Sequence, residues 1–251
     1  MNSSSTSERA APAYPAPRRL VRRHALTVRI THWLNVLCFS LLLMSGLQIF
    51  NAHPRLYWGA YGADADQAFI ALGERAFPSW ITLPSYHDLA AGRQWHFFFA
   101  WLFVLNGLVY LGHALLRRHL VRDLLPSRDQ LSPRHVWHEI VDHARLRFAK
   151  GEAARRYNAL QKMSYLLVAL VLLPLMVVTG LTMSPGIDAA FPWLPELFGG
   201  RQSARTLHFL AAGSLVLFVA VHLVMVIVSG LWNNMRSMVT GRYAIDVTGE
   251  H

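Results

Sequence analysis

Two of the protein's 13 histidines, His208 and His222, are fourteen residues apart in one strongly apolar stretch. On an α-helix this spacing leaves the two side chains within about 40° of each other and about 21 Å apart along the axis. One face of the helix therefore presents imidazoles at two depths. A single zinc ion takes helical ligands about one turn apart, so the spacing favours two separate cofactors.

Three further histidines lie in apolar stretches, namely His32, His96 and His113. Ionisable side chains at membrane depth are costly, and each is a candidate for function. A neutral imidazole nitrogen is a natural iron ligand, and two histidines facing each other across a helical bundle can hold haem b without covalent attachment. The histidines therefore predict two bis-histidine haem b sites.

The depth of each histidine suggests how the ligands pair. His96 and His208 each stand second in an apolar run that enters the membrane from the same side, so we expect them to share a level. His222 lies about 21 Å further along its helix, where His32 is the expected partner. His113 is a rival for that role, because by simple counting it matches His32 in depth better than His222 does. Against it, His113 points about 100° away from the face of His96, which favours a structural role at the interface.

Four apolar stretches are long enough to carry these residues across a membrane, which takes roughly 20 residues of helix. They cover residues 30–50, 95–116, 163–183 and 207–231. With 53% hydrophobic and 15% charged residues and a mean hydropathy of +0.28, the chain lies outside the soluble class. We predict an all-α integral membrane four-helix bundle over residues 29–243. Residues 1–28 are predicted to be a disordered tail, and residues 244–251 a short C-terminal tail.

The basic residues predict the orientation. Of the 24 Lys and Arg residues, 19 lie in the N-terminal segment through residue 29, in residues 117–162, or after residue 231. Basic residues are retained on the cytoplasmic side, so both termini should be cytoplasmic and the protein should be a multi-pass protein of the cell inner membrane. Residues 51–94 then form a folded periplasmic cap on which a partner could dock.

Composition also excludes several classes of function. The net charge of +10 could suggest nucleic acid, but the basic residues flank apolar runs and form no base-reading motif, so we expect no nucleic-acid partner. The single cysteine, Cys38, excludes a disulfide framework, an iron–sulfur cluster and the attachment motif of c-type haem. Membrane lipid is the expected surrounding.

Several segments resemble a known family. The block RITHWLNVLCFSLLLMSGL (29–47), a histidine opening the second span and a final span with histidines fourteen apart resemble the bacterial cytochrome b561 and nickel–iron hydrogenase cytochrome b superfamily. RRYNALQK (155–162) is similar to formate dehydrogenase gamma subunits. PRLYWGAYG (54–62) resembles thiosulfate-reductase-type cytochrome b subunits. The resemblance covers roughly residues 22–243.

The resemblance implies a four- or five-helix diheme subunit that links the quinone pool to a peripheral oxidoreductase. It implies that His32 and His222 hold an inner haem, while His96 and His208 hold an outer one. It also implies a quinone site beside the inner haem, lined by Asn158 and its neighbours. Those relatives commonly have glycine at the position that Leu160 occupies here.

The residue types around that position suit a quinone. Asn158 and Gln161 carry amides able to hold a quinone carbonyl, and Tyr157 stands beside them. The alternative is that both amides cap the third helix. Three arginines near the span edges, Arg29, Arg93 and Arg205, could pair with haem propionates, although ordinary interfacial snorkelling explains them about as well.

The leading hypothesis is a diheme b-type cytochrome that transfers electrons between quinone and a periplasmic oxidoreductase, with no substrate-turnover centre of its own. On resemblance, a molybdopterin enzyme of the sulfite-oxidase or thiosulfate-reductase kind is the favoured partner, and a hydrogenase is second. The alternatives are a proton-coupled transporter with a histidine relay and a passive membrane anchor. Transporters usually show inverted repeats, and an anchor leaves the paired histidines unexplained. Haem content separates the three.

Overall fold

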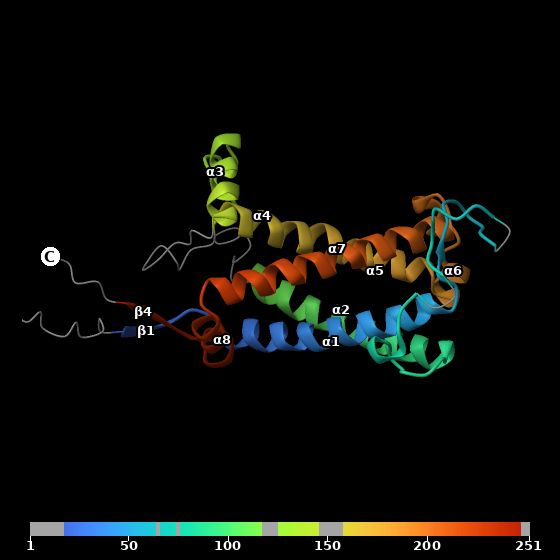
Figure 1. Cartoon of the computed structure of the whole chain (residues 1–251), viewed down its shortest axis with the longest axis horizontal. Coiled ribbons are helices and arrows are strands. Elements are labelled where there is room, and N and C mark those ends of the chain that lie inside the picture. The colour runs from blue at the N-terminus through green and yellow to red at the C-terminus, as the bar shows by residue number, and fades with distance from the viewer. Residues whose placement is uncertain (1–17, 64–65, 74–75, 117–124, 146–157, 247–251) are drawn as a thin grey trace, which may run out of the picture.

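The computed structural model describes residues 18–63, 66–73, 76–116, 125–145 and 158–246. Four long helical segments run side by side in these residues (Figure 1). They are α1 (Leu26–Asn51), α2 (Leu89–Leu116), the segment Ala159–Thr182 and α7 (Arg201–Val228). All four are long and apolar enough to cross a membrane, which confirms the predicted helical architecture of a multi-pass membrane protein.

The helices begin earlier than the sequence predicted. Each starts four to six residues before its expected span, as α2 does at residue 89 instead of 95. Hydropathy detects only the part of a helix that lies in hydrocarbon, whereas polar residues such as Arg93 and Arg205 continue the helix into the interface. The last span also ends sooner, at Val228 instead of residue 231. Gly230, with φ of 112°, breaks the helix before α8 (Leu231–Thr240).

The third span is not a uniform α-helix. It consists of α4 (Ala159–Leu167), a π-helical turn over Val168–Leu172 and α5 (Leu173–Thr182). Pro174 lies just after the π-helical turn, and proline cannot donate the backbone hydrogen bond that an uninterrupted α-helix requires. A local widening of the helix accommodates the missing donor.

The helices pack as two hairpins. The most extensive helix contact joins α1 to α2, and the next joins α5 to α7. At one end of the bundle, β1 (Arg18–Arg22) pairs antiparallel with β4 (Arg242–Asp246). The prediction of disorder up to residue 28 is therefore wrong for residues 18–28, and the predicted tail from residue 244 begins inside a strand. An even number of spans brings the two chain ends together, and this long-range pairing has no local sequence signal. Residues 1–17 and 247–251 lie outside the described residues.

The connections at the opposite end form a cap. The first contains β2 (Arg55–Leu56) paired with β3 (Ile70–Ala71), and η1 (Ser79–Ile81). The second contains α6 (Pro185–Ala190) and η5 (Pro195–Phe198). The carbonyl of Gly59 accepts hydrogen bonds from the backbone N–H groups of Gln202 and Ser203, so the first connection satisfies free donors at the start of α7.

This docking requires glycine at position 200. Gly200 has φ of 118°, and a Cβ there would lie 2.5 Å from the backbone of Ala60. We expect Gly200→Ala to lower the free energy of unfolding by roughly 1–3 kcal/mol and to expose the cap to protease. Gly186→Ala is the matched control, since a Cβ there meets nothing within 4 Å. Equal melting temperatures and cleavage rates for the two variants would contradict this account.

Candidate functional site

The four histidines predicted as ligands meet in two pairs. The ring centres of His32 on α1 and His222 on α7 are 6.4 Å apart, and those of His96 on α2 and His208 on α7 are 6.3 Å apart. We call the first the inner pair and the second the outer pair, after the orientation predicted from the basic residues. In each pair the rings are inclined by 63°. Helix α7 thus contributes one imidazole to each pair, and the first hairpin contributes the other.

The separation of the rings suits a metal held between two imidazoles. Two metal–imidazole bonds of about 2.0 Å on opposite sides of one ion place the ring centres roughly 6–6.5 Å apart. In the described part of the chain, no group of three or more His, Cys, Asp or Glu side chains could hold a metal ion. A site with two protein ligands therefore fits haem better than a structural zinc ion, which takes four. All four rings keep some exposed surface for a bound group.

His113 does not join either pair among the ring contacts of the described residues, and the partner facing His32 is His222. The facing rings are thus the two that the rotational argument favours over the simpler count of depth, and the role of these histidines as ligands stays a prediction. His113 lies near the end of α2 and is partly exposed.

The outer pair is held by two hydroxyls that sequence reasoning missed. Ser45 Oγ lies 3.1 Å from His96 Nδ1, and Thr179 Oγ1 lies 3.0 Å from His208 Nδ1. Both hydroxyl residues are fully buried. A signal for them exists in the sequence, because Ser45 begins Ser-Gly-Leu in the first span and Thr179 begins Thr-Gly-Leu in the third.

Aromatic rings surround the inner pair. His32 contacts Trp33 edge-on with ring centres 5.5 Å apart, and His222 stacks on Phe218 at 6.1 Å. Phe218 in turn contacts Tyr165 of α4 edge-on at 6.4 Å. Tyr165, the seventh residue of α4, therefore links the third span to the inner pair.

A buried amide fixes the first hairpin close to the inner pair. Asn106 of α2 is 5% exposed, and its Nδ2 donates to the Thr31 carbonyl at 2.8 Å and to Asn35 Oδ1 at 2.6 Å. Polar groups at membrane depth must find partners in neighbouring helices. This contact sets the register of α2 against the turn of α1 that carries His32. Asn106 carries no charge, so the rule that ionisable side chains at membrane depth are functional candidates does not identify it.

The residues proposed for quinone binding form a helix cap. Asn158 Oδ1 accepts from the Gln161 backbone N–H at 2.8 Å, and Gln161 Oε1 accepts from the Asn158 backbone N–H at 3.3 Å. This reciprocal arrangement is a capping box, so the alternative that both amides cap the third helix is confirmed. The structure does not test their contact with quinone, and Tyr157 lies outside the described residues.

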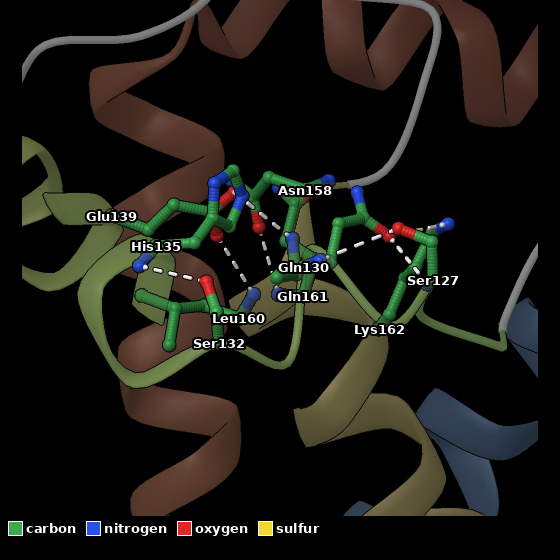
Figure 2. A network of polar contacts seen from close by, with 10 residues as sticks. Ser127, Gln130, Ser132, His135, Glu139, Asn158, Leu160, Gln161 and Lys162 are labelled. Atoms are coloured by element: carbon green, nitrogen blue, oxygen red, sulfur yellow. Dashed lines mark hydrogen bonds and ion pairs between the residues drawn. The ribbon is translucent and has the colours of Figure 1, made fainter. Parts of the chain in front are cut away.

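A carboxylate from another helix completes this cap (Figure 2). Helix α3 (Pro133–Ala144) projects from the bundle where α4 begins (Figure 1). Its Glu139 accepts hydrogen bonds from the backbone N–H groups of Ala159 at 3.1 Å and Leu160 at 3.0 Å, and it pairs with His135 Nε2 at 3.1 Å. Negative charge is favourable at a helix N-terminus. Glu139 therefore ties α3 to the third span, a contact between distant residues that sequence spacing does not reveal.

Removing this carboxylate should loosen the start of α4. We expect Glu139→Ala to cost about 1–3 kcal/mol locally, because two backbone donors lose their acceptor. Amide hydrogen exchange at Ala159 and Leu160 should become faster, whereas Asp142→Ala on the same helix should leave it unchanged. Identical exchange in the two variants would show that Glu139 does not hold the helix end.

The three edge arginines all contact the protein. The Arg29 guanidinium donates to the Val239 carbonyl on α8. Arg93 lies over the Phe97 ring at 5.9 Å, and Arg205 lies over Phe50 at 5.7 Å. Each stands three residues before a paired histidine, in the segments Arg29–His32, Arg93–His96 and Arg205–His208. Residues three apart share a helix face, so each arginine is about one turn from a paired histidine on the same side of its helix.

The profile of the prokaryotic cytochrome b561 family matches residues 23–241, which include all four long helices and both histidine pairs. The chain belongs to the prokaryotic cytochrome b561 family. This confirms the resemblance seen in the sequence and the assignment to haem b-binding membrane cytochromes. This cytochrome is also 34% identical over 203 residues to YedZ1 of Azospira oryzae, described as a candidate subunit of a protein-methionine-sulfoxide reductase. The alignment covers 81% of this chain and 89% of the relative.

Proposed function

We propose that this cytochrome transfers electrons through two haem b groups, one held by His32 and His222 and the other by His96 and His208. The observation that carries the proposal is the presence of two facing imidazole pairs on one face of α7, each with ring centres 6.3–6.4 Å apart. When bound, such a haem carries one electron on its iron. The four histidines would hold the two groups, and the helices place the two sites at two depths.

The inner pair faces the quinone side in this proposal. The contact series from His222 through Phe218 reaches Tyr165, the seventh residue of α4, and supports a quinone site on the side of the bundle where the third span lies. Asn158 and Gln161 of the helix cap, with Tyr157, are the proposed quinone contacts, because an amide side chain can donate a hydrogen bond to a quinone carbonyl. The predicted orientation places this region at the cytoplasmic face of the inner membrane.

The outer pair faces a periplasmic oxidoreductase. The first connection of the cap is anchored two residues before His208, because Thr206 donates to the Tyr57 carbonyl at 2.7 Å. Exposed aromatic side chains on the cap, such as Trp58 and Tyr61, offer a docking surface. The description of YedZ1 as a methionine-sulfoxide reductase subunit supports an oxidoreductase partner. We favour a molybdopterin enzyme over a hydrogenase. Arg93 and Arg205, with Arg29 at the inner pair, are the proposed partners of the haem propionates.

The purified protein should contain two haem b groups that acidic acetone extracts. Alanine at any one of the four paired histidines should remove about one haem, because the facing imidazole alone cannot hold a six-coordinate iron. The control is His113→Ala, which should retain both. The pyridine haemochrome assay measures this stoichiometry. One haem or none in fully loaded wild-type protein would overturn the diheme proposal.

A substitution that spares the helix cap can test the quinone site. Asn158→Asp keeps a side-chain oxygen for the cap but loses the amide donor, so we expect slower haem reduction by a quinol analogue with both haem spectra intact. Asn158→Leu loses the donor and the cap, and should show the same kinetic defect together with a destabilised α4. Unchanged quinol kinetics in the aspartate variant would move the quinone site elsewhere.

A further inference from the structure

We propose that Ser45 and Thr179 are positioning residues that fix the tautomer and ring orientation of His96 and His208 and thereby lower the redox potential of the outer haem. The inference rests on the proposed function in one respect, namely that the outer pair holds a haem. Within the described residues, no hydroxyl contact of this kind is found at His32 or His222. The two pairs are therefore predicted to differ in potential and in the rigidity of their ligands.

The direction of each hydrogen bond follows from the hydroxyl's own geometry. A hydroxyl has one proton, and Ser45 Oγ lies 2.7 Å from the Leu41 carbonyl four residues earlier on α1. With that proton on the carbonyl, the oxygen is left to accept from His96 Nδ1 at 3.1 Å. The Leu42 carbonyl of the same turn is a second acceptor for the ring. Nδ1 of His96 must then carry the ring proton, which leaves the lone pair on Nε2. This is the tautomer that an iron ligand bound through Nε2 requires.

The same arrangement occurs on the other side of the site. Thr179 Oγ1 lies 2.6 Å from the Leu175 carbonyl and 3.0 Å from His208 Nδ1, and the Met176 carbonyl is a second acceptor for that ring. His208 is thereby assigned the same tautomer as its partner. Both hydroxyls have no exposed surface, so water does not compete for these bonds.

A glycine beside each hydroxyl makes room for the imidazole. A Cβ at Gly46 would lie 3.4 Å from His96 Cε1, and a Cβ at Gly180 would lie 3.4 Å from His208 Cε1. Each ring therefore packs directly against a helix backbone while its Nδ1 is held by the preceding residue. The Ser-Gly and Thr-Gly pairs act as matching seats for the two rings.

The two hairpins form these contacts with the outer rings in the same way. His96 and His208 are each the eighth residue of a 28-residue helix, α2 and α7. The Ser-Gly pair of α1 contacts His96 on α2, and the Thr-Gly pair of α5 contacts His208 on α7. In both cases the two helices pack directly against each other. Two unrelated stretches of sequence thus produce the same contact on opposite sides of one site, which argues that the contact serves the site itself.

The contact has a chemical consequence for a bound iron. A ring that donates from Nδ1 is a more basic ligand at Nε2, and a more basic ligand stabilises ferric over ferrous iron. Hydrogen bonding to axial ligands is one of the means by which a protein tunes haem potential. Loss of either hydroxyl should therefore make the potential of the outer haem more positive and leave the inner haem unchanged.

The test uses Ser45→Ala and Thr179→Val, of which the second keeps the shape of threonine. Each should shift the midpoint potential of one haem in the positive direction and weaken retention of that haem by about 10–100-fold, as is typical when the partner of a metal-bound histidine is lost. The low-spin electron paramagnetic resonance signal of that haem should also change, because the ring loses one of the two acceptors that orient it. Ser45→Thr and Thr179→Ser restore the hydroxyl and should restore all three properties.

Two matched controls are available on the same bundle. Ser40 on α1 and Ser214 on α7 also donate to carbonyls four residues earlier, at 2.8 and 2.9 Å, but both are exposed and neither contacts a paired histidine. Alanine at either position should leave both potentials unchanged.

The outcomes separate the two proposals. If wild-type protein holds one haem or none, or if His96→Ala retains both haems, the proposed function fails. If both haems are present and Ser45→Ala and Thr179→Val leave both potentials and the resonance signals unchanged, the positioning role is overturned while the diheme proposal stands. A shift of equal size in the Ser40→Ala control, or failure of the hydroxyl-restoring variants to reverse it, would likewise overturn the positioning role.

Discussion

The constraint on which the structure depends is that an imidazole at membrane depth must be given partners on every polar atom. Helix α7 carries two such rings on one face, so both must be met by groups from neighbouring helices. The first hairpin meets them with His32 and His96, at ring separations that leave space for a metal. The packing of the two hairpins follows from this requirement, because only a close and correctly rotated pair of hairpins brings both sets of rings face to face.

The same constraint explains the choice of uncharged polar residues inside the bundle. Ser45 and Thr179 satisfy their own protons on helix carbonyls and still accept from a histidine, so they add no unpaired group to the apolar interior. Asn106 spans α1 and α2 in a comparable manner. At the start of the third span, Glu139 and Asn158 share the free backbone donors of α4. Each contact is short-ranged, and together they define how the helices are rotated.

The sequence was most informative where the length of an apolar run or the repeat of the α-helix alone determined the structure. Apolar length predicted the four helices, and the helical repeat predicted that His208 and His222 share a face and that His113 does not join them. It was least informative for contacts between distant segments, since β1 pairs with β4 across the whole chain and Glu139 reaches α4 from a separate helix. The hydroxyls escaped notice because serine and threonine are common in membrane helices and only their position relative to a histidine gives them significance.

The differences between the two pairs suit different exchange partners under the proposed function. The outer rings are seated against backbone and held by buried hydroxyls, beneath a cap that is bonded to the start of α7. A rigid site of this kind requires little rearrangement when an electron passes to a docked protein. The inner rings contact Trp33 and Phe218, and Phe218 contacts Tyr165 of the third span, whose first residues are held by one carboxylate of α3. A diffusible quinone needs access from the membrane, and this end offers aromatic surface and hydrogen-bonding amides where the outer end offers a closed cap.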